Sequence, residues 1–297
     1  MHSLAIVSAF FAMASAHGVV LSVEGANGVT MPGLSIADGT PRDCSSNRCG
    51  SQADTSIIRD REIRSGEASA LGRTQGNGPV DASVMISNFL GSGNANNVPT
   101  NNGTESATGV EDDLSNLPKG NNQGNNNNRQ RRQLGNFLGG LFGGGRGGGG
   151  EKTETAEETS VAATAGEGAS KGLPTASDNG EINQDGAGPM TAEIDATSGG
   201  TDPDAFQTAE VTQDVPGIGI QGLSLATNTD FPLKVQMPQG MTCEGSVGGA
   251  NNVCIVRVRN GAAAGPFGGS GAFTQSAASR KRAIAFRLKK RMEIVRY

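Results

Sequence analysis

Short apolar runs separated by Gly, Pro and Asn recur in two parts of the chain. They are GVVLSVEG, DTSIIRD and ASVMISNFL in the first part, then DFPLKVQMP and VCIVRVRN in the second. In the last run, residues 253–260, Val and Ile alternate with Arg, which is typical of a strand that buries one face. Many short strands with turn residues between them predict an all-β fold, a single β-sandwich-like domain.

The strand pattern is interrupted between residues 96 and 178 by Asn runs, Gly runs and an acidic Ala/Thr-rich stretch. This stretch has no strand or helix period, so we interpret it as one long disordered insertion. The chain has 46 Gly, no Trp and one Tyr, which argues against a core that extends throughout. Residues 17–95 and 179–275 would together form the domain, because either part alone is small for a stable core.

Residues 1–16 have the pattern of a secretion signal, in which an apolar run precedes the small residues Ala-Ser-Ala. The run is about ten residues long, which suits a signal peptide and is short of the roughly 20 residues of a membrane span. We therefore expect cleavage between Ala16 and His17, a secreted, extracellular product and no transmembrane segment.

The tail, residues 276–297, differs from both parts because eight Lys and Arg stand there against one Glu. Its apolar residues fall close to a helical period in the order Ala277, Ile284, Leu288, Met292 and Val295. We predict a basic tail that is helical in preference to an alternating strand. It is a solvated helix, or a processing site at Lys281-Arg282 or Lys290-Arg291, or it adheres to an acidic surface such as anionic lipid or a pectin-like polymer.

The four cysteines, Cys44, Cys49, Cys243 and Cys254, suit disulfides in an oxidising compartment. Three pairings are open, and the sequence does not choose among them. A zinc site of four thiolates is the alternative, but the spacings differ from those of paired C-x2-C knuckles.

Two motifs in the predicted insertion concern modification. Asn102 begins an Asn-Gly-Thr acceptor for a glycan, and Arg131-Arg132 ends a basic run that is either a protease site or an uncut solvated segment. The net charge of −5 argues against a nucleic-acid partner, and the oligomeric state is left open.

Five blocks of the chain carry a resemblance to a known family. They are HGVVLSVEGANG, ADTSIIRDREI, GRTQGNGPVDAS, NQDGAGPMTAEID and CEGSVGGANNVCIVRVRNGAAAGPFGGSGAFTQS. In this order they resemble the powdery-mildew Egh-type family of secreted fungal virulence factors expressed in appressoria. The resemblance implies a small β-rich protein used when a fungus penetrates its host. It does not imply a particular biochemical activity. The chain departs from the family's pattern in having no His before DGAGP and no Cys shortly after it.

A histidine at the mature N-terminus resembles the copper site of lytic polysaccharide monooxygenases. In those enzymes the terminal amine and imidazole chelate copper and a second imidazole completes the site, which suits Cu(II). This chain has two His, and His2 would leave with the leader, so His17 is the single imidazole of the mature chain. Copper would then need a deprotonated backbone amide or a carboxylate ligand as a substitute. The candidates are Asp38, Asp43, Asp54 and Asp185.

Hydrolytic chemistry has no better support. A glycosidase needs two carboxylates about 5–10 Å apart, whereas Asp54 and Asp60 would lie roughly 20 Å apart along an extended strand. We expect these two residues to hold turn amides or to pair with Arg59 and Arg61. No nucleophile-elbow motif surrounds Ser56.

The sequence therefore predicts a secreted virulence factor that binds cell-wall polysaccharide or a host surface without catalysis and without a cofactor. The alternative is a copper-binding, monooxygenase-like protein that uses His17. Aromatic side chains for stacking on sugars are scarce; the well-placed ones in the second part are Phe206, Phe231 and Phe267, of which Phe267 is expected in the core.

Overall fold

The computed structural model describes residues 18–37, 54–92, 167–176, 179–186, 188–216, 230–262 and 265–294. Its elements before the predicted insertion are β1 (Gly18–Glu24), β2 (Thr30–Pro32), β3 (Ser56–Ile57), α1 (Asp60–Ser65), β4 (Arg73–Thr74), β5 (Gly78–Pro79) and α2 (Ala82–Phe89). The next are α4 (Gly168–Lys171), β6 (Thr175–Ala176), β7 (Asn179–Gly186), β8 (Met190–Asp195), the 3-10 turn η4 (Pro203–Ala205) and β9 (Phe206–Gln213). The last are β10 (Asp230–Gln236), β11 (Gly245–Val247), β12 (Ala250–Asn260), β13 (Phe267–Gln275) and α5 (Ala277–Ile294).

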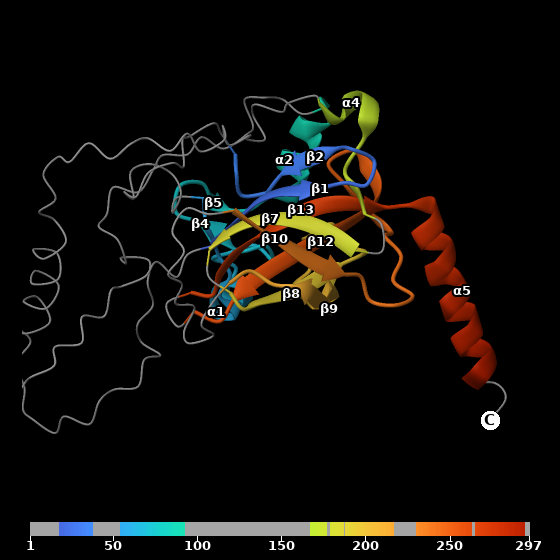
Figure 1. Ribbon diagram of the computed structural model, residues 1–297. Coiled ribbons are helices and arrows are strands. Elements are labelled where there is room, and N and C mark those ends of the chain that lie inside the picture. The colour runs from blue at the N-terminus through green and yellow to red at the C-terminus, as the bar shows by residue number, and fades with distance from the viewer. Residues whose placement is uncertain are drawn as a thin grey trace, which may run out of the picture.

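The described strands form one sheet that folds back on itself (Figure 1). Their order is β2-β1-β7-β10-β9-β8-β12-β13-β3-β4-β5, with β11 beside β12 and β6 beside β13. All pairs are antiparallel except the short β6–β13 pair. Because β1 packs against β13, which lies far along this order, the sheet must turn over between them. The all-β expectation is confirmed.

The main core fills the space between the two layers of the folded sheet. Val20 and Val23 of β1 lie in one cluster with Ile194 of β8, Val256 of β12 and Phe273 of β13. Residues from both sides of the predicted insertion therefore bury their apolar surface against each other in a single core.

Glycines in β13 let β1 approach its surface closely. A Cβ built on Gly269 would lie 2.9 Å from Cβ of Val20, and one on Gly271 would lie 2.2 Å from Cγ2 of Val23. Glycine inside a strand usually weakens it, and it is retained where another backbone must come close. Here the glycines make room for the two buried valines of β1.

The opposite face of β12 and β13 is covered by α2, which corrects one prediction. The run ASVMISNFL was expected as a strand, but it forms a helix whose cap Asp81 accepts hydrogen bonds from the amides of Ser83 (2.8 Å) and Val84 (3.3 Å). The buried apolar residues have helical spacing and contribute to a second core cluster; they are Ala82, Met85, Ile86 and Phe89. A capping Asp before residues spaced i, i+3, i+4, i+7 is a helix signal that the strand interpretation overlooked.

The strand β12 was expected to expose its arginines, and this is wrong for Arg257. Val253 and Ile255 face the second cluster, and Arg257 follows them on the same face, only 4% exposed. A strand in the middle of a covered sheet has no solvent face, so charged side chains on it must find partners inside the protein.

Regular structure begins again within the segment predicted as an insertion. Helix α4 and strand β6 lie between residues 167 and 176, which were assigned to the insertion 96–178. Asn27 holds this segment to the β1–β2 turn, because it donates to the carbonyl of Leu173 (3.1 Å) and accepts from the amide of Thr175 (2.9 Å). The predicted insertion up to residue 166 lies outside the described residues.

Cys243 and Cys254 form a disulfide across 11 residues of sequence, which excludes a zinc site of four thiolates. The bond joins the segment before β11 to the centre of β12, and both cysteines are fully buried in the main core. Cys44 and Cys49 lie outside the described residues.

The glycine contact predicts a packing defect on addition of one methyl group. We expect Gly271→Ala to lower the free energy of unfolding by about 1–3 kcal/mol, because its Cβ would overlap Val23 in a filled core. Urea unfolding measures this change. Gly261→Ala is the matched control, since a Cβ there meets no atom within 4 Å.

Adding Val23→Ala to Gly271→Ala should restore part of the lost stability, because the smaller side chain vacates the space that the new methyl group needs. A double variant no more stable than Gly271→Ala would contradict the packing explanation.

Candidate functional site

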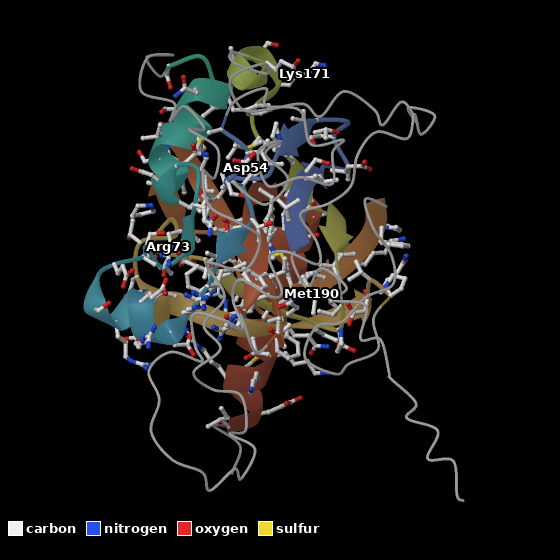
Figure 2. The ribbon with its side chains drawn as sticks, turned by 90° about the vertical axis from the view of Figure 1, so that its left-hand side faces the viewer. Asp54, Arg73, Lys171 and Met190 are labelled. Carbon is white, nitrogen blue, oxygen red and sulfur yellow. A yellow bond between two sulfur atoms is a disulfide. The ribbon has the colours of Figure 1, made fainter. Side chains whose placement is uncertain are left out.

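A cluster of charged side chains surrounds Glu62 of α1. Glu62 is 2% exposed and accepts hydrogen bonds from Nη1 of Arg59 (2.8 Å) and Nε of Arg73 (2.8 Å). Arg59 also donates to the carbonyl of Gly265, which precedes β13 (3.3 Å). Arg73 lies beside α1 at the edge of the sheet (Figure 2). One carboxylate therefore holds a helix and a sheet edge together.

The arginines of β12 extend this cluster across the sheet. Arg257 pairs with Glu193 of β8 (2.6 Å), donates to the carbonyl of Ala70 and lies over the ring of Phe206, 4.2 Å from its centre. Arg259 pairs with Asp60 of α1 (2.6 Å). Both guanidinium groups are thus paired with carboxylates: the Arg257–Glu193 pair is largely buried, whereas Asp60 in the other pair is 59% exposed.

The pKa of Glu62 lies below its ordinary value of 4.5. Burial is the largest influence and by itself raises the pKa, but the hydrogen bonds from Arg59 and Arg73 and their positive charges outweigh it. Glu62 is therefore held ionised as an anchor between two cations. A general acid needs the opposite shift.

Asp195 at the end of β8 is a second buried carboxylate with a structural role. Its oxygens accept hydrogen bonds from the amides of Thr197 (2.8 Å), Ser198 (2.8 Å) and Gly200 (2.7 Å). Burial raises its pKa, and the bonds from Ser198, Thr197 and Gly200 lower it by more, so the pKa lies below the ordinary 3.8. Asp195 thus fixes the turn after β8.

A groove of about 350 Å³ lies between the segment after β10 and the first half of α5. Its walls carry both hydrogen-bonding and apolar side chains: Gln236, Met237, Gln239, Gln275, Arg282 and Phe286. Such a mixture of amide, guanidinium and ring surfaces can bind a polar chain that has apolar faces.

Helix α5 forms one wall of the groove and is fixed at its beginning. Ser276 follows β13 directly, and its hydroxyl accepts a hydrogen bond from the amide of Ser279 (3.1 Å), as an N-cap does. Arg280 donates to Asn252 of β12 (2.6 Å), and Arg287 donates to Thr242 (2.7 Å). The prediction of a helical basic tail is confirmed.

Beyond its anchored start, α5 projects from the sheet (Figure 1). Every residue from Ile284 to Ile294 is exposed. No helix in the described part of the chain is long and apolar enough to cross a membrane.

Most site residues expected from the sequence lie outside the described residues: Ala16, His17, Asp38, Asp43, Asn102, Arg131 and Arg132. Of the others, Asp54 is buried and accepts a hydrogen bond from Asn77 (3.2 Å), and Asp60 pairs with Arg259. Because the two carboxylates have different partners, they do not form a catalytic pair.

The strand register gives the surroundings of the start of β1. Gly18 pairs with Gly186 and Val19 with Asp185 of β7, and Asp185 also pairs with Asp230 of β10. In the ranges that the structure describes, no three His, Cys, Asp or Glu side chains come together as a metal site would require.

Sequence reasoning missed the groove. Gln236, Gln239 and Gln275 have no motif around them; they come from β10, the segment after it and the end of β13, and α5 adds Arg282 and Phe286 to the same groove. Phe286 was visible as an aromatic residue in the tail, but it was not considered for binding. Phe267 is fully buried, as expected.

These features define an all-β protein with internally paired charges and a surface groove beside a basic helix. The chain belongs to the Egh16-like virulence factor family, whose sequence profile matches residues 15–268. The match ends before α5, so the projecting helix lies beyond the part that the family profile describes.

Two relatives show the same relationship. The chain is 51% identical over 300 residues to the "Appressoria-specific virulence factor GAS2" of Pyricularia oryzae, which covers 97% of this chain and 94% of the relative. It is 40% identical over 121 residues to the "Appressoria-specific virulence factor GAS1" of the same fungus, covering 39% of this chain and 46% of the relative. No solved structure matches the chain.

Because Glu62 is buried, its replacement by an uncharged residue should have a large effect on stability. Glu62→Gln should lower the free energy of unfolding at neutral pH by about 3 kcal/mol, because it leaves Arg59 and Arg73 without their anion. Glu67→Gln is the control: Glu67 is 62% exposed and 3.9 Å from Arg73, so less than about 1 kcal/mol is expected.

The lowered pKa also gives the pH dependence of this effect. A depressed carboxyl pKa stabilises the fold above the unfolded value and loses that contribution as pH falls through the folded value. Urea unfolding from neutral pH to below 4.5 should therefore show the wild type approaching Glu62→Gln in stability. A difference that stays constant with pH would contradict the assignment.

Proposed function

We propose that the protein is secreted and acts without catalysis, by binding a polysaccharide of the cell wall or host surface during penetration by the fungus. The groove between the end of β10 and α5 is the binding site. The names of the relatives, appressoria-specific virulence factors, support a role in infection, and the leader with its Ala-Ser-Ala box supports secretion.

The lining of the groove is the observation that carries this proposal. Gln236, Gln239 and Arg282 offer amide and guanidinium groups to sugar hydroxyls, and Phe286 offers a ring face to the apolar side of a sugar. The wall is pre-formed, because Phe286 lies against Gly240, where a Cβ would be 3.1 Å from the ring. A pre-formed groove lowers the entropic cost of binding an extended polymer.

The charged cluster supports the non-catalytic part of the proposal. Glu62 and Asp195 are buried, held ionised and fully engaged in fixing α1 and the turn after β8. Perturbed pKa values also occur in structural ion-pair networks, and here the partners of each carboxylate are protein groups in the interior.

Retention on insoluble polymers tests the proposal. The full secreted chain should be retained by at least one of chitin, cellulose and pectin. Gln236→Ala/Gln239→Ala should weaken retention by roughly tenfold, because two hydrogen-bonding side chains of the groove are lost.

Leu288→Gln is the matched control, since Leu288 is exposed and is not among the residues that line the groove. Retention on none of the three polymers, or equal retention of the groove variant and the wild type, would count against the groove.

A copper-binding, monooxygenase-like reaction at His17 is the second candidate. The register favours it in one respect, because Val19, two residues after His17 in the sequence, pairs with Asp185 of β7. The donors nevertheless do not fit: the mature chain offers one imidazole and its terminal amine, and a T-shaped site of three nitrogens needs a second imidazole. We derive no oxidative step from this set of ligands.

The copper candidate and the binding proposal predict different results. Protein whose N-terminus is confirmed as His17 by mass spectrometry, loaded with Cu(II) and given a reductant, should release no oxidised fragments from chitin or cellulose. Calorimetric titration of His17→Ala in parallel shows whether His17 holds copper at all. Recovery of oxidised fragments from the wild type alone would overturn the non-catalytic proposal.

A further inference from the structure

We propose that the exposed face of α5 binds anionic lipid surfaces. This inference goes beyond the proposed function, because it names a partner for a different surface and holds whether or not the groove binds a polysaccharide. It starts from the distribution of apolar side chains. Large exposed apolar side chains in the described residues are all in α5: Ile284, Phe286, Leu288, Met292 and Ile294.

Three of these side chains form a stripe. Ile284, Leu288 and Met292 are spaced four residues apart, so they follow one face of the helix. Ser279 and Ala283 are buried against the domain at positions on the opposite face. The stripe, which we call the outer stripe, is therefore directed away from the groove and is 41 to 60% exposed.

Cations surround the outer stripe. The helix carries seven Lys and Arg and one Glu, whereas the whole chain has a net charge of −5. Arg280 and Arg287 are used to attach the helix to the domain. Lys281, Lys289, Lys290 and Arg291 are exposed and remain to meet a partner. Repulsion among so many like charges on one helix is relieved by an anionic surface.

An anionic membrane matches both properties of this face. A helix that lies in the lipid interface buries apolar side chains among the acyl chains while its Lys and Arg contact anionic headgroups. Each basic residue near such a surface contributes to binding, and long basic side chains can keep their charge at the headgroups. The acidic remainder of the chain favours an orientation in which α5 alone approaches the membrane.

Two other partners match less well. An acidic polysaccharide would satisfy the cations, but it offers no apolar interior for Ile284, Leu288 and Met292. A second copy of the helix would need apolar residues at alternating steps of three and four, and Lys281 and Arg291 interrupt that seam on either side of Ile284 and Leu288.

The attachment of α5 makes the surface available without unfolding. Ser276 begins the helix one residue after β13, so its direction is fixed by the sheet. The bonds from Arg280 and Arg287 attach the helix as far as its middle, and the exposed residues Leu288 to Ile294 extend beyond them (Figure 1). The membrane would thus meet a helix that is already formed, which lowers the ordering cost of binding.

Vesicle co-sedimentation with the full chain tests the inference. We expect binding to vesicles of phosphatidylcholine with phosphatidylserine, little binding to phosphatidylcholine alone, and loss of binding in high salt, where charges are screened. Lys289→Gln/Lys290→Gln should weaken binding about 30-fold. Arg64→Gln/Lys171→Gln removes the same charge from exposed positions on α1 and α4, away from the free end of α5 (Figures 1 and 2), and should change binding less than about twofold.

Substitutions in the outer stripe distinguish lipid binding from polymer binding. Ile284→Gln/Leu288→Gln/Met292→Gln should weaken vesicle binding about tenfold or more and leave binding to polygalacturonate unchanged. Circular dichroism of this variant should retain the helix, because the three side chains are exposed. Wild-type binding to polygalacturonate and not to anionic vesicles, or full vesicle binding by the triple variant, would overturn the inference.

Fluorescence gives an independent measurement. The chain has no Trp, so Met292→Trp introduces a single reporter in the outer stripe. Its emission should shift to shorter wavelength when anionic vesicles are added, whereas Thr208→Trp, at an exposed position of β9, should show no shift. No shift for Met292→Trp under conditions of sedimentation would exclude burial of the stripe in lipid.

Discussion

The close approach of β1 to β13 is the constraint on which the rest of the structure depends. Val20 and Val23 occupy space that Cβ atoms at Gly269 and Gly271 would take, so the two strands pack at backbone distance. This contact brings the beginning of the described chain onto its last strand and encloses the main core. It also frees the other face of β13 for a second cluster with α2. A glycine-rich strand is therefore the centre of the fold and not a weak part of it.

The same contact determines why charges must be buried. With layers on both faces, β12 has little solvent-exposed surface: Arg257 is 4% exposed, the side chain of Arg259 is 21% exposed, and both pair with carboxylates. Glu193 and Asp60 supply them, from a neighbouring strand and from α1. Buried ion pairs contribute little net stability compared with apolar packing, but losing one partner is costly. Here the largely buried Arg257–Glu193 pair joins β12 to β8, and the partly exposed Arg259–Asp60 pair joins β12 to α1.

Local pattern was enough to predict the strands β1, β10 and β12 and the helical tail, because each has a period that packing preserves. It failed where the outcome depended on distant partners. Arg257 pairs with Glu193, 64 residues away, and Arg259 pairs with Asp60, 199 residues away, so alternation alone made them appear exposed. The groove was unpredictable for the same reason: its lining comes from β10, the end of β13 and α5, which are far apart in the sequence. For α2 the signal was present in Asp81 and the spacing of its apolar residues.

Helix α5 connects the two surfaces to which partners are assigned. Its inner face, with Ala283 and Phe286, forms a wall of the groove, and its outer stripe points the opposite way. Because the helix is one rigid element continuous with β13, a ligand in the groove and a lipid surface on the stripe can be bound at once without competing for side chains. Both sites would then be positioned by the strand whose glycines hold β1 in place. Damage to that packing should weaken the binding of both partners together, whereas changes on one face of α5 should leave binding to the other face intact.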